Sequence, residues 1–104
     1  MDSLDTFIEE LLMDEGNREG LLNDMISHLK EQAIPSLEQL KTGYTDNTQL
    51  HGVYYDYDKK EVTISYRVVP DLHPDRVMSF SNFQVILEGL LVCRRHKRWE
   101  LNHL

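Results

Sequence analysis

The side chains best suited to chemistry in this sequence are its histidines. They are spread along the chain as His28, His51, His73, His96 and His103. None stands at metal-ligand spacing from another, and no cysteine pair is present to complete a zinc site. We therefore expect no metal site and no bound cofactor.

An acidic segment, Asp56-Tyr57-Asp58, begins like a calcium-binding loop. Such a loop needs glycine at its sixth position and a bidentate glutamate at its twelfth. Glu61 and Arg67 stand at those positions instead. The sequence therefore does not predict a calcium site.

A loop bounded by prolines carries Asp71, His73 and Asp75, which could form an acid–base pair. Polar loops of this kind are common, so an ordinary turn is the favoured interpretation. The chain has no nucleophile-elbow serine and no glycine-rich phosphate loop. We expect the protein not to be an enzyme.

The densest run of charge is Arg94-Arg95-His96-Lys97-Arg98. Cations in the last turns of a helix complement its dipole. The favoured interpretation is therefore that these side chains are solvated or are neutralised by acidic groups of the same chain. On a helical wheel three of these cations continue the direction of the apolar core stripe, so they must lie past the edge of the core or their stems must snorkel out of it. They are Arg94, Lys97 and Arg98. A site for an acidic partner and a nucleic-acid contact remain open as alternatives.

The same helix carries a second apolar stripe, formed by Val85, Val92 and Trp99 at seven-residue spacing. The favoured interpretation is burial on both sides of the helix, because helices that are apolar all round are usually buried. The alternative is a stripe that faces another chain. Aromatic and arginine side chains dominate interface hot spots. The candidate partner-binding residues are Val92, Arg94, Arg95, His96, Arg98 and Trp99.

Two N-terminal helices are predicted from apolar residues at helical spacing. The first runs from Leu4 to Leu12, capped by Asp2 or Ser3 and ended by Gly16. The second begins near Asn17 and continues to Leu40 with its apolar stripe in phase. Because Pro35 lies inside that stripe, we expect one kinked helix that packs antiparallel to the first.

The periodicity then changes to two, which predicts a β-hairpin. Its strands cover residues 53–57 and 62–68, joined by a turn at residues 58–60. Residues 45–47 are expected to form a loop, and residues 76–80 a short third strand. Most of the hairpin's tyrosines alternate onto the apolar face, which favours core packing over base stacking. The hairpin's tyrosines are Tyr54, Tyr55, Tyr57 and Tyr66, and at least the last three are expected on the apolar face.

A capping box at Ser81 and Gln84, with Phe80 and Val85 as a hydrophobic staple, predicts the start of a C-terminal helix. The helix is favoured over a rival hairpin that turns at residues 88–89. Cys93 is the single cysteine and is expected to be a buried, unreactive thiol.

Length and composition predict one α+β domain covering residues 1–104. The formal net charge is −7. Residues 1–42 carry all of the excess negative charge, which disfavours nucleic-acid binding. With no signal peptide, no membrane-spanning run and no disulfide, the cytoplasm is the expected location.

We therefore expect two N-terminal helices, the second kinked at Pro35, then a β-hairpin or three-stranded antiparallel sheet and a C-terminal helix, in two-layer packing. The predicted function is a non-enzymatic protein–protein interaction module: an adaptor, inhibitor or accessory subunit. Its partner is another protein or a second copy of the chain. The alternatives are a nucleic-acid-linked regulator that uses residues 94–98, a DNA mimic formed by the acidic N-terminal helices, and an enzymatic or small-ligand domain with a pocket beside the hairpin.

Overall fold

The structure is a computed structural model that describes residues 2–13, 18–30, 43–69 and 71–102. For Arg18 and residues 95–102 it describes the backbone only. The expected helix end at Gly16, the kink at Pro35 and the apolar positions from Ala33 to Leu40 lie outside the described residues.

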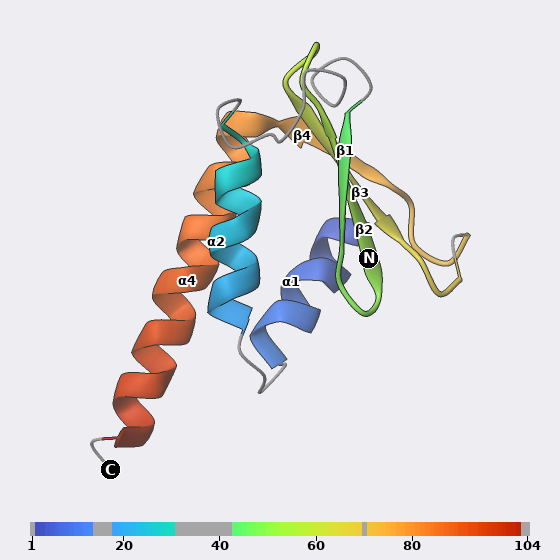
Figure 1. The fold of residues 1–104 in the computed structure, drawn as a ribbon. Coiled ribbons are helices and arrows are strands. Elements are labelled where there is room, and N and C mark those ends of the chain that lie inside the picture. Colours follow the sequence, from blue (N-terminus) through green and yellow to red (C-terminus); the bar gives the residue numbers. More distant parts are fainter. Residues whose placement is uncertain (1, 14–17, 31–42, 70, 103–104) are drawn as a thin grey trace.

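Within the described ranges, three helices and four strands form an α+β fold (Figure 1). The elements are, in chain order, α1 (Ser3–Met13), α2 (Arg18–His28), β1 (Tyr44–Asn47), β2 (His51–Asp56), β3 (Glu61–Tyr66), β4 (Arg76–Ser79) and α4 (Phe80–Asn102). The strands form one antiparallel sheet in the order β1-β2-β3-β4. The α+β prediction is therefore confirmed, and so is the helical assignment of residues 83–95.

Strand β1 corrects the expectation that residues 45–47 form a loop. Its polar residues have low strand propensity, but Tyr44 pairs with Tyr55 and Asp46 pairs with Val53 of β2. Pairing with β2 therefore decides the conformation of this segment. The predicted third strand is present as β4.

The helices cover one face of the sheet (Figure 1). Alternate residues of β2 and β3 point into the core, and the register places Val53 opposite Ile64 and Tyr55 opposite Val62. Apolar side chains from all three helices fill the space above them. The fully buried ones are Phe7, Leu11, Leu22, Met25, Phe83 and Leu87.

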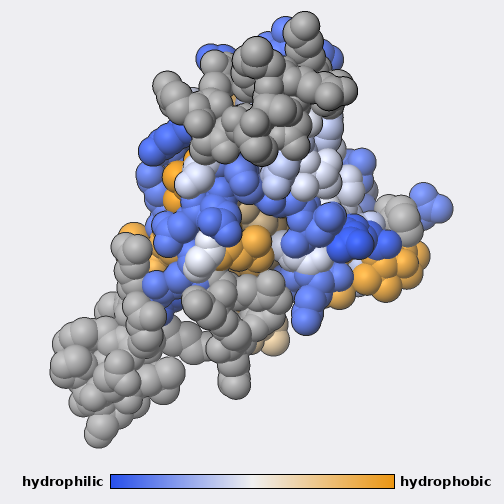
Figure 2. Space-filling view, viewed as in Figure 1, coloured by the Kyte–Doolittle hydropathy of each residue, from blue (hydrophilic) through white to orange (hydrophobic). Residues whose placement is uncertain are grey.

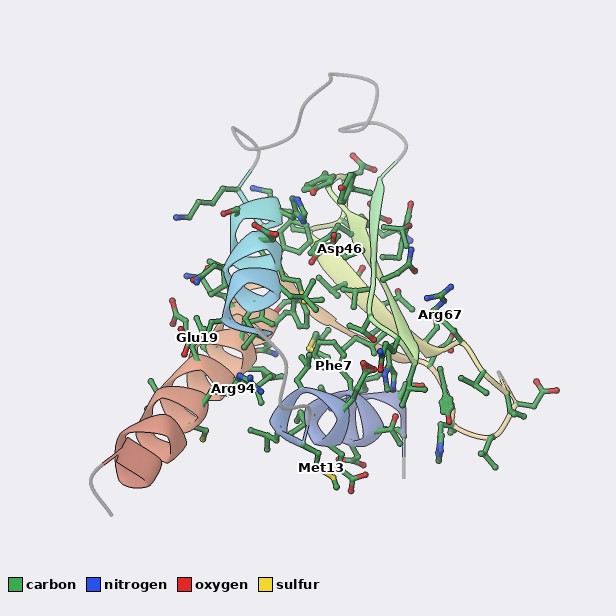
Figure 3. The ribbon with its side chains drawn as sticks, turned by 60° about the horizontal axis from the view of Figure 1, so that its bottom comes forward. Phe7, Met13, Glu19, Asp46, Arg67 and Arg94 are labelled. Carbon is green, nitrogen blue, oxygen red and sulfur yellow. The ribbon has the colours of Figure 1, made fainter. Side chains whose placement is uncertain are left out.

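Helices α2 and α4 lie side by side and run in opposite directions, while α1 crosses below them at a steep angle (Figures 1 and 3). The expected antiparallel pairing of the first two helices is therefore wrong. Because Phe7 and Leu11 of α1 are buried against the sheet and α4, the apolar face of α1 is used there instead of on α2.

Polar side chains fix the helix starts. Asp2 caps α1 by accepting the backbone amides of Leu4 and Asp5, at 3.0 and 3.1 Å. The backbone amide of Asp5 and then the guanidinium of Arg76 lower the pKa of the Asp2 carboxyl below its ordinary value.

Helix α4 starts two residues earlier than its capping box predicts. The Ser79 hydroxyl accepts the amide of Asn82 at 3.1 Å, so Ser79 and not Ser81 is the cap. Val85, the predicted staple partner of Phe80, is exposed. The strand-ending serine serves both elements, since α4 follows β4 with no intervening residue.

Candidate functional site

The exposed face of α4 carries apolar side chains that the domain does not cover. Val85 and Val92 are 68% and 64% exposed and stand seven residues apart, which places them on the same side of the helix. The opposite side bears Phe83, Leu87 and Leu90, which are buried. The expectation that the Val85–Val92 stripe is buried inside the domain is therefore wrong, because α2, α1 and the sheet all pack on the other side.

The helix is also longer than the domain it packs against. Its 23 residues span about 34 Å at 1.5 Å per residue. In Figure 1 its C-terminal turns extend past the ends of α1 and α2. The backbone of this projecting segment carries the predicted partner-binding positions Arg95, His96, Arg98 and Trp99, whose side chains lie outside the described part of the chain.

Arg94 has a different role from that of a free surface cation. Its Nη1 donates a hydrogen bond to the backbone carbonyl of Leu11 at 2.6 Å, and Figure 3 shows the side chain pointing from α4 toward α1. Leu11 lies in the last turn of α1, where carbonyl groups lack helical partners and the helix dipole is negative. Arg94 therefore stabilises the contact between two helices of the same domain.

A shallow groove lies beside Val85. It has a volume of about 280 Å³ and is lined by Leu4, Arg76, Met78, Asn82, Val85 and Ile86. Its lining is mostly apolar, with the polar ends of Arg76 and Asn82 among it. The groove therefore continues the apolar face of α4 toward α1 and β4.

Cys93 lies next to this face and is exposed, which corrects the expectation of a buried thiol. It follows Val92 by 100° around the helix, which puts it outside the arc that faces the core. Apolar sequence neighbours do not predict burial in a helix, because adjacent residues point in different directions.

His28, His51 and His73 each contact other side chains of the domain. His51 is fully buried, and Thr6 and Glu10 of α1 contact its two ring nitrogens. His73 packs against the ring of Tyr66, with centroids 4.8 Å apart. No group of three or more His, Cys, Asp or Glu side chains is arranged as metal ligands in the described ranges.

A second polar cluster joins α2 to the sheet. Asp46 Oδ2 accepts a hydrogen bond from the Tyr55 hydroxyl at 2.8 Å and lies 2.6 Å from His28 Nδ1. The Tyr57 hydroxyl donates to the His28 carbonyl at 2.6 Å. Burial, followed by the nearby Asp46 carboxylate, raises the pKa of both tyrosine hydroxyls above the ordinary value. These groups hold α2 in place and present neutral phenols.

The hairpin tyrosines divide between the two faces of the sheet as alternation predicts. Tyr55 and Tyr57 are buried, and Tyr66 is half-buried beside His51. Tyr54 lies on the open face, in register with Thr63.

An apolar patch that sequence analysis missed lies on the loop between β3 and β4. Val68, Val69 and Leu72 are all exposed there. Figure 2 shows the patch as orange atoms at the right edge of the molecule. The signal was present as three apolar residues around Pro70, but the alternation of β3 assigned Val68 to the apolar face of the strand.

In the described part of the chain, the acidic side chains of the N-terminal helices, which the DNA-mimic alternative would use, are not all exposed. Glu10 turns into the domain, and its side chain is only 5% exposed. Glu9 and Asp24 are exposed, while Asp14 and Glu15 lie outside the described residues.

No helix in the described ranges is both long enough and apolar enough to cross a bilayer. Comparison of the chain with family models, curated proteins and solved structures finds no match.

Proposed function

We propose that the protein is a non-enzymatic protein–protein interaction module, an adaptor, inhibitor or accessory subunit, whose contact surface is the exposed face of α4. The observation that carries the proposal is the exposure of Val85 and Val92 on one side of a helix that projects beyond the domain. The partner is another protein or a second copy of this chain. The absence of a cysteine pair supports a cytoplasmic location.

Two exposed valines alone would be unremarkable on a protein surface. Here they share one helix face, and the groove lined by Leu4, Met78 and Ile86 begins beside the first of them. Covering a valine side chain fully is worth about 1.5–3 kcal/mol. A partner that covers both valines and places an apolar side chain in the groove would therefore gain useful binding energy.

The other functions considered have less support from the described residues. His51 is enclosed, and the groove beside Val85 contains no histidine, so the acid–base chemistry of an enzyme has no exposed histidine in that groove to build on. Arg94 is engaged with Leu11, which takes one cation from a nucleic-acid site in residues 94–98. Titration with DNA and RNA at two salt concentrations tests that alternative, since phosphate contacts make binding strongly salt-dependent.

The contact surface is tested by comparing two double variants. Val85→Glu with Val92→Glu places two charges on the exposed face of α4, where glutamate is also a better helix former than valine. Val68→Glu with Val69→Glu adds the same charge to the β3–β4 loop and serves as the matched control. Partner capture from the native cell and self-association by sedimentation are measured for both, with circular dichroism as the check on folding.

We expect the α4 variant to lose capture or self-association while the loop variant retains it and both stay folded. Equal behaviour of the two variants, or loss only in the loop variant, would contradict the assignment of the surface to α4. Arg95→Ala with Trp99→Ala extends the test to the projecting turns. Weakened binding with an intact fold supports their role, whereas unfolding of this variant would identify them as core residues.

A further inference from the structure

A buried polar cluster between α1 and the sheet plays no part in the proposed contact surface. Its centre is the fully buried ring of His51, at the start of β2. His51 Nδ1 lies 2.8 Å from Glu10 Oε1, and His51 Nε2 lies 2.7 Å from Thr6 Oγ1. Both ring nitrogens therefore contact the same helix, one turn apart.

The contacts of Glu10 indicate which partner carries the proton at Nδ1. Glu10 Oε1 accepts a hydrogen bond from the Thr48 hydroxyl at 2.6 Å and from the Leu50 amide at 3.2 Å. An oxygen that accepts several donors is typical of an ionised carboxylate, which has no proton of its own to give. Nδ1 of His51 must therefore be the donor.

The contacts of Thr6 indicate the same for Nε2. The Thr6 hydroxyl donates to the carbonyl of Ser3 at 3.1 Å. A hydroxyl has one proton, so it cannot also donate to His51. Both bonds coexist only when Nε2 of His51 carries a proton and donates it to the Thr6 oxygen.

We propose that His51 is doubly protonated in the folded protein and forms with Glu10 and Thr6 a proton-dependent latch that holds α1 against the sheet. Neutral His51 must give up either the Thr6–Ser3 bond or its own bond to Thr6. It also leaves the Glu10 carboxylate buried without a cation, which is a costly arrangement.

The other groups around the His51 ring supply little to balance the negative charge of Glu10. Phe7 of α1 and Tyr66 of β3 meet the imidazole edge-on, with centroids 5.8 and 5.4 Å away. His73 lies beyond Tyr66, and the Arg67 guanidinium donates to the Thr48 carbonyl at 3.0 Å. Glu10 Oε2 is buried and accepts no hydrogen bond from the described residues, so the cluster depends on the charge of His51.

The latch is strongest in acid and weakens as His51 loses its second proton. Histidine is the side chain whose charge ordinarily changes between about pH 5 and pH 8, so a comparison on either side of that range tests the latch. The helical residues of the latch, Thr6 and Glu10, both belong to α1, and α4 contributes no residue to it, although Arg94 and Phe83 of α4 contact α1 elsewhere. Loosening should therefore be local to α1.

Two measurements on the full chain at about pH 5.5 and about pH 8.5 test the latch. Nitrogen NMR reports whether each ring nitrogen of His51 carries a proton. Amide hydrogen exchange, corrected for the intrinsic effect of pH, reports the opening of α1 relative to α4. We expect two protonated nitrogens at the lower pH, one at the higher, and α1 opening about tenfold more often, which corresponds to about 1.4 kcal/mol.

His51→Gln should remove the pH response of α1. Thr6→Val should reduce this response, and it provides the test if His51→Gln does not fold. His28→Gln, at another histidine paired with a carboxylate, is the control and should leave the response unchanged. An unprotonated ring nitrogen at the lower pH, a ring that keeps both protons at the higher, or an α1 response that persists in the variants would overturn the proposal.

Discussion

Gly89 gives a direct test of the exposed face of α4, because it lies on that face between Val85 and Val92. A Cβ added at this position meets no atom within 4 Å apart from the neighbouring helix backbone. The substitution Gly89→Ala therefore creates neither a clash nor a new contact. Its effect should be the difference in helix propensity alone, a gain of about 0.8–1.0 kcal/mol in the free energy of unfolding.

The gain is measured by urea and thermal unfolding at a concentration where sedimentation shows a monomer. For a domain of this size, about 1 kcal/mol raises the Tm by about 4–8 °C. Gly20→Ala is the matched helical control, since Gly20 of α2 also has no atom within 4 Å of an added Cβ, and it should stabilise too. Gly43→Ala should destabilise, because Gly43 has a φ of 87° and the Tyr54 ring occupies the space of a Cβ.

A loss of stability in the monomeric Gly89→Ala variant, with the expected gain in Gly20→Ala, would refute the reasoning. It would mean that another part of the same chain covers this face of α4. The valines on either side could then no longer be taken as a surface left open for a partner.

Three further outcomes are expected in unfolding experiments. Leu90→Ala should cost about 2–5 kcal/mol because Leu90 is buried, whereas Val92→Ala should stay within about 0.5 kcal/mol; similar losses would contradict the assigned orientation of α4. Because the folded-state pKa of Tyr55 is raised, its contribution to stability is complete below about pH 10 and declines above it, so Tyr55→Phe should show a shallower decline in base. Because the folded-state pKa of Asp2 is lowered, the contribution of its charge is present above about pH 4 and lost in stronger acid. Asp2→Asn should therefore be less stable than the parent at neutral pH and should match it at about pH 2, and a difference that is constant with pH would argue against a stabilising charge at this cap.

Periodicity in the sequence predicts much of the fold. The helical spacing of Leu4, Phe7 and Leu11 gives α1 and its buried face, and the alternation of Val62 and Ile64 gives the inward face of β3. Strand β1 could not be found in this way, because Asp46 and Asn47 are poor strand formers. Its conformation depends on the neighbouring strand, which is a tertiary effect.

The surface of α4 is only partly contained in the sequence. Seven-residue spacing correctly puts Val85 and Val92 on one side of the helix, but whether the domain covers that side depends on where the other helices pack. The His51–Glu10 pair is less predictable still, since 41 residues separate its members and no local spacing connects them. Buried polar pairs of this kind follow from the completed fold.

Because α4 follows β4 directly, a movement of the helix is transmitted to the sheet. The amide of Phe80, the first residue of α4, donates to the Lys60 carbonyl in the turn between β2 and β3, so the base of the helix is anchored to the sheet at 3.0 Å. The helix is about 34 Å long, so a tilt of about five degrees about this anchored end would move its far end by about 3 Å. A force applied by a partner at the projecting turns would act on β4, which is an edge strand of the described sheet, and would tend to separate it from β3.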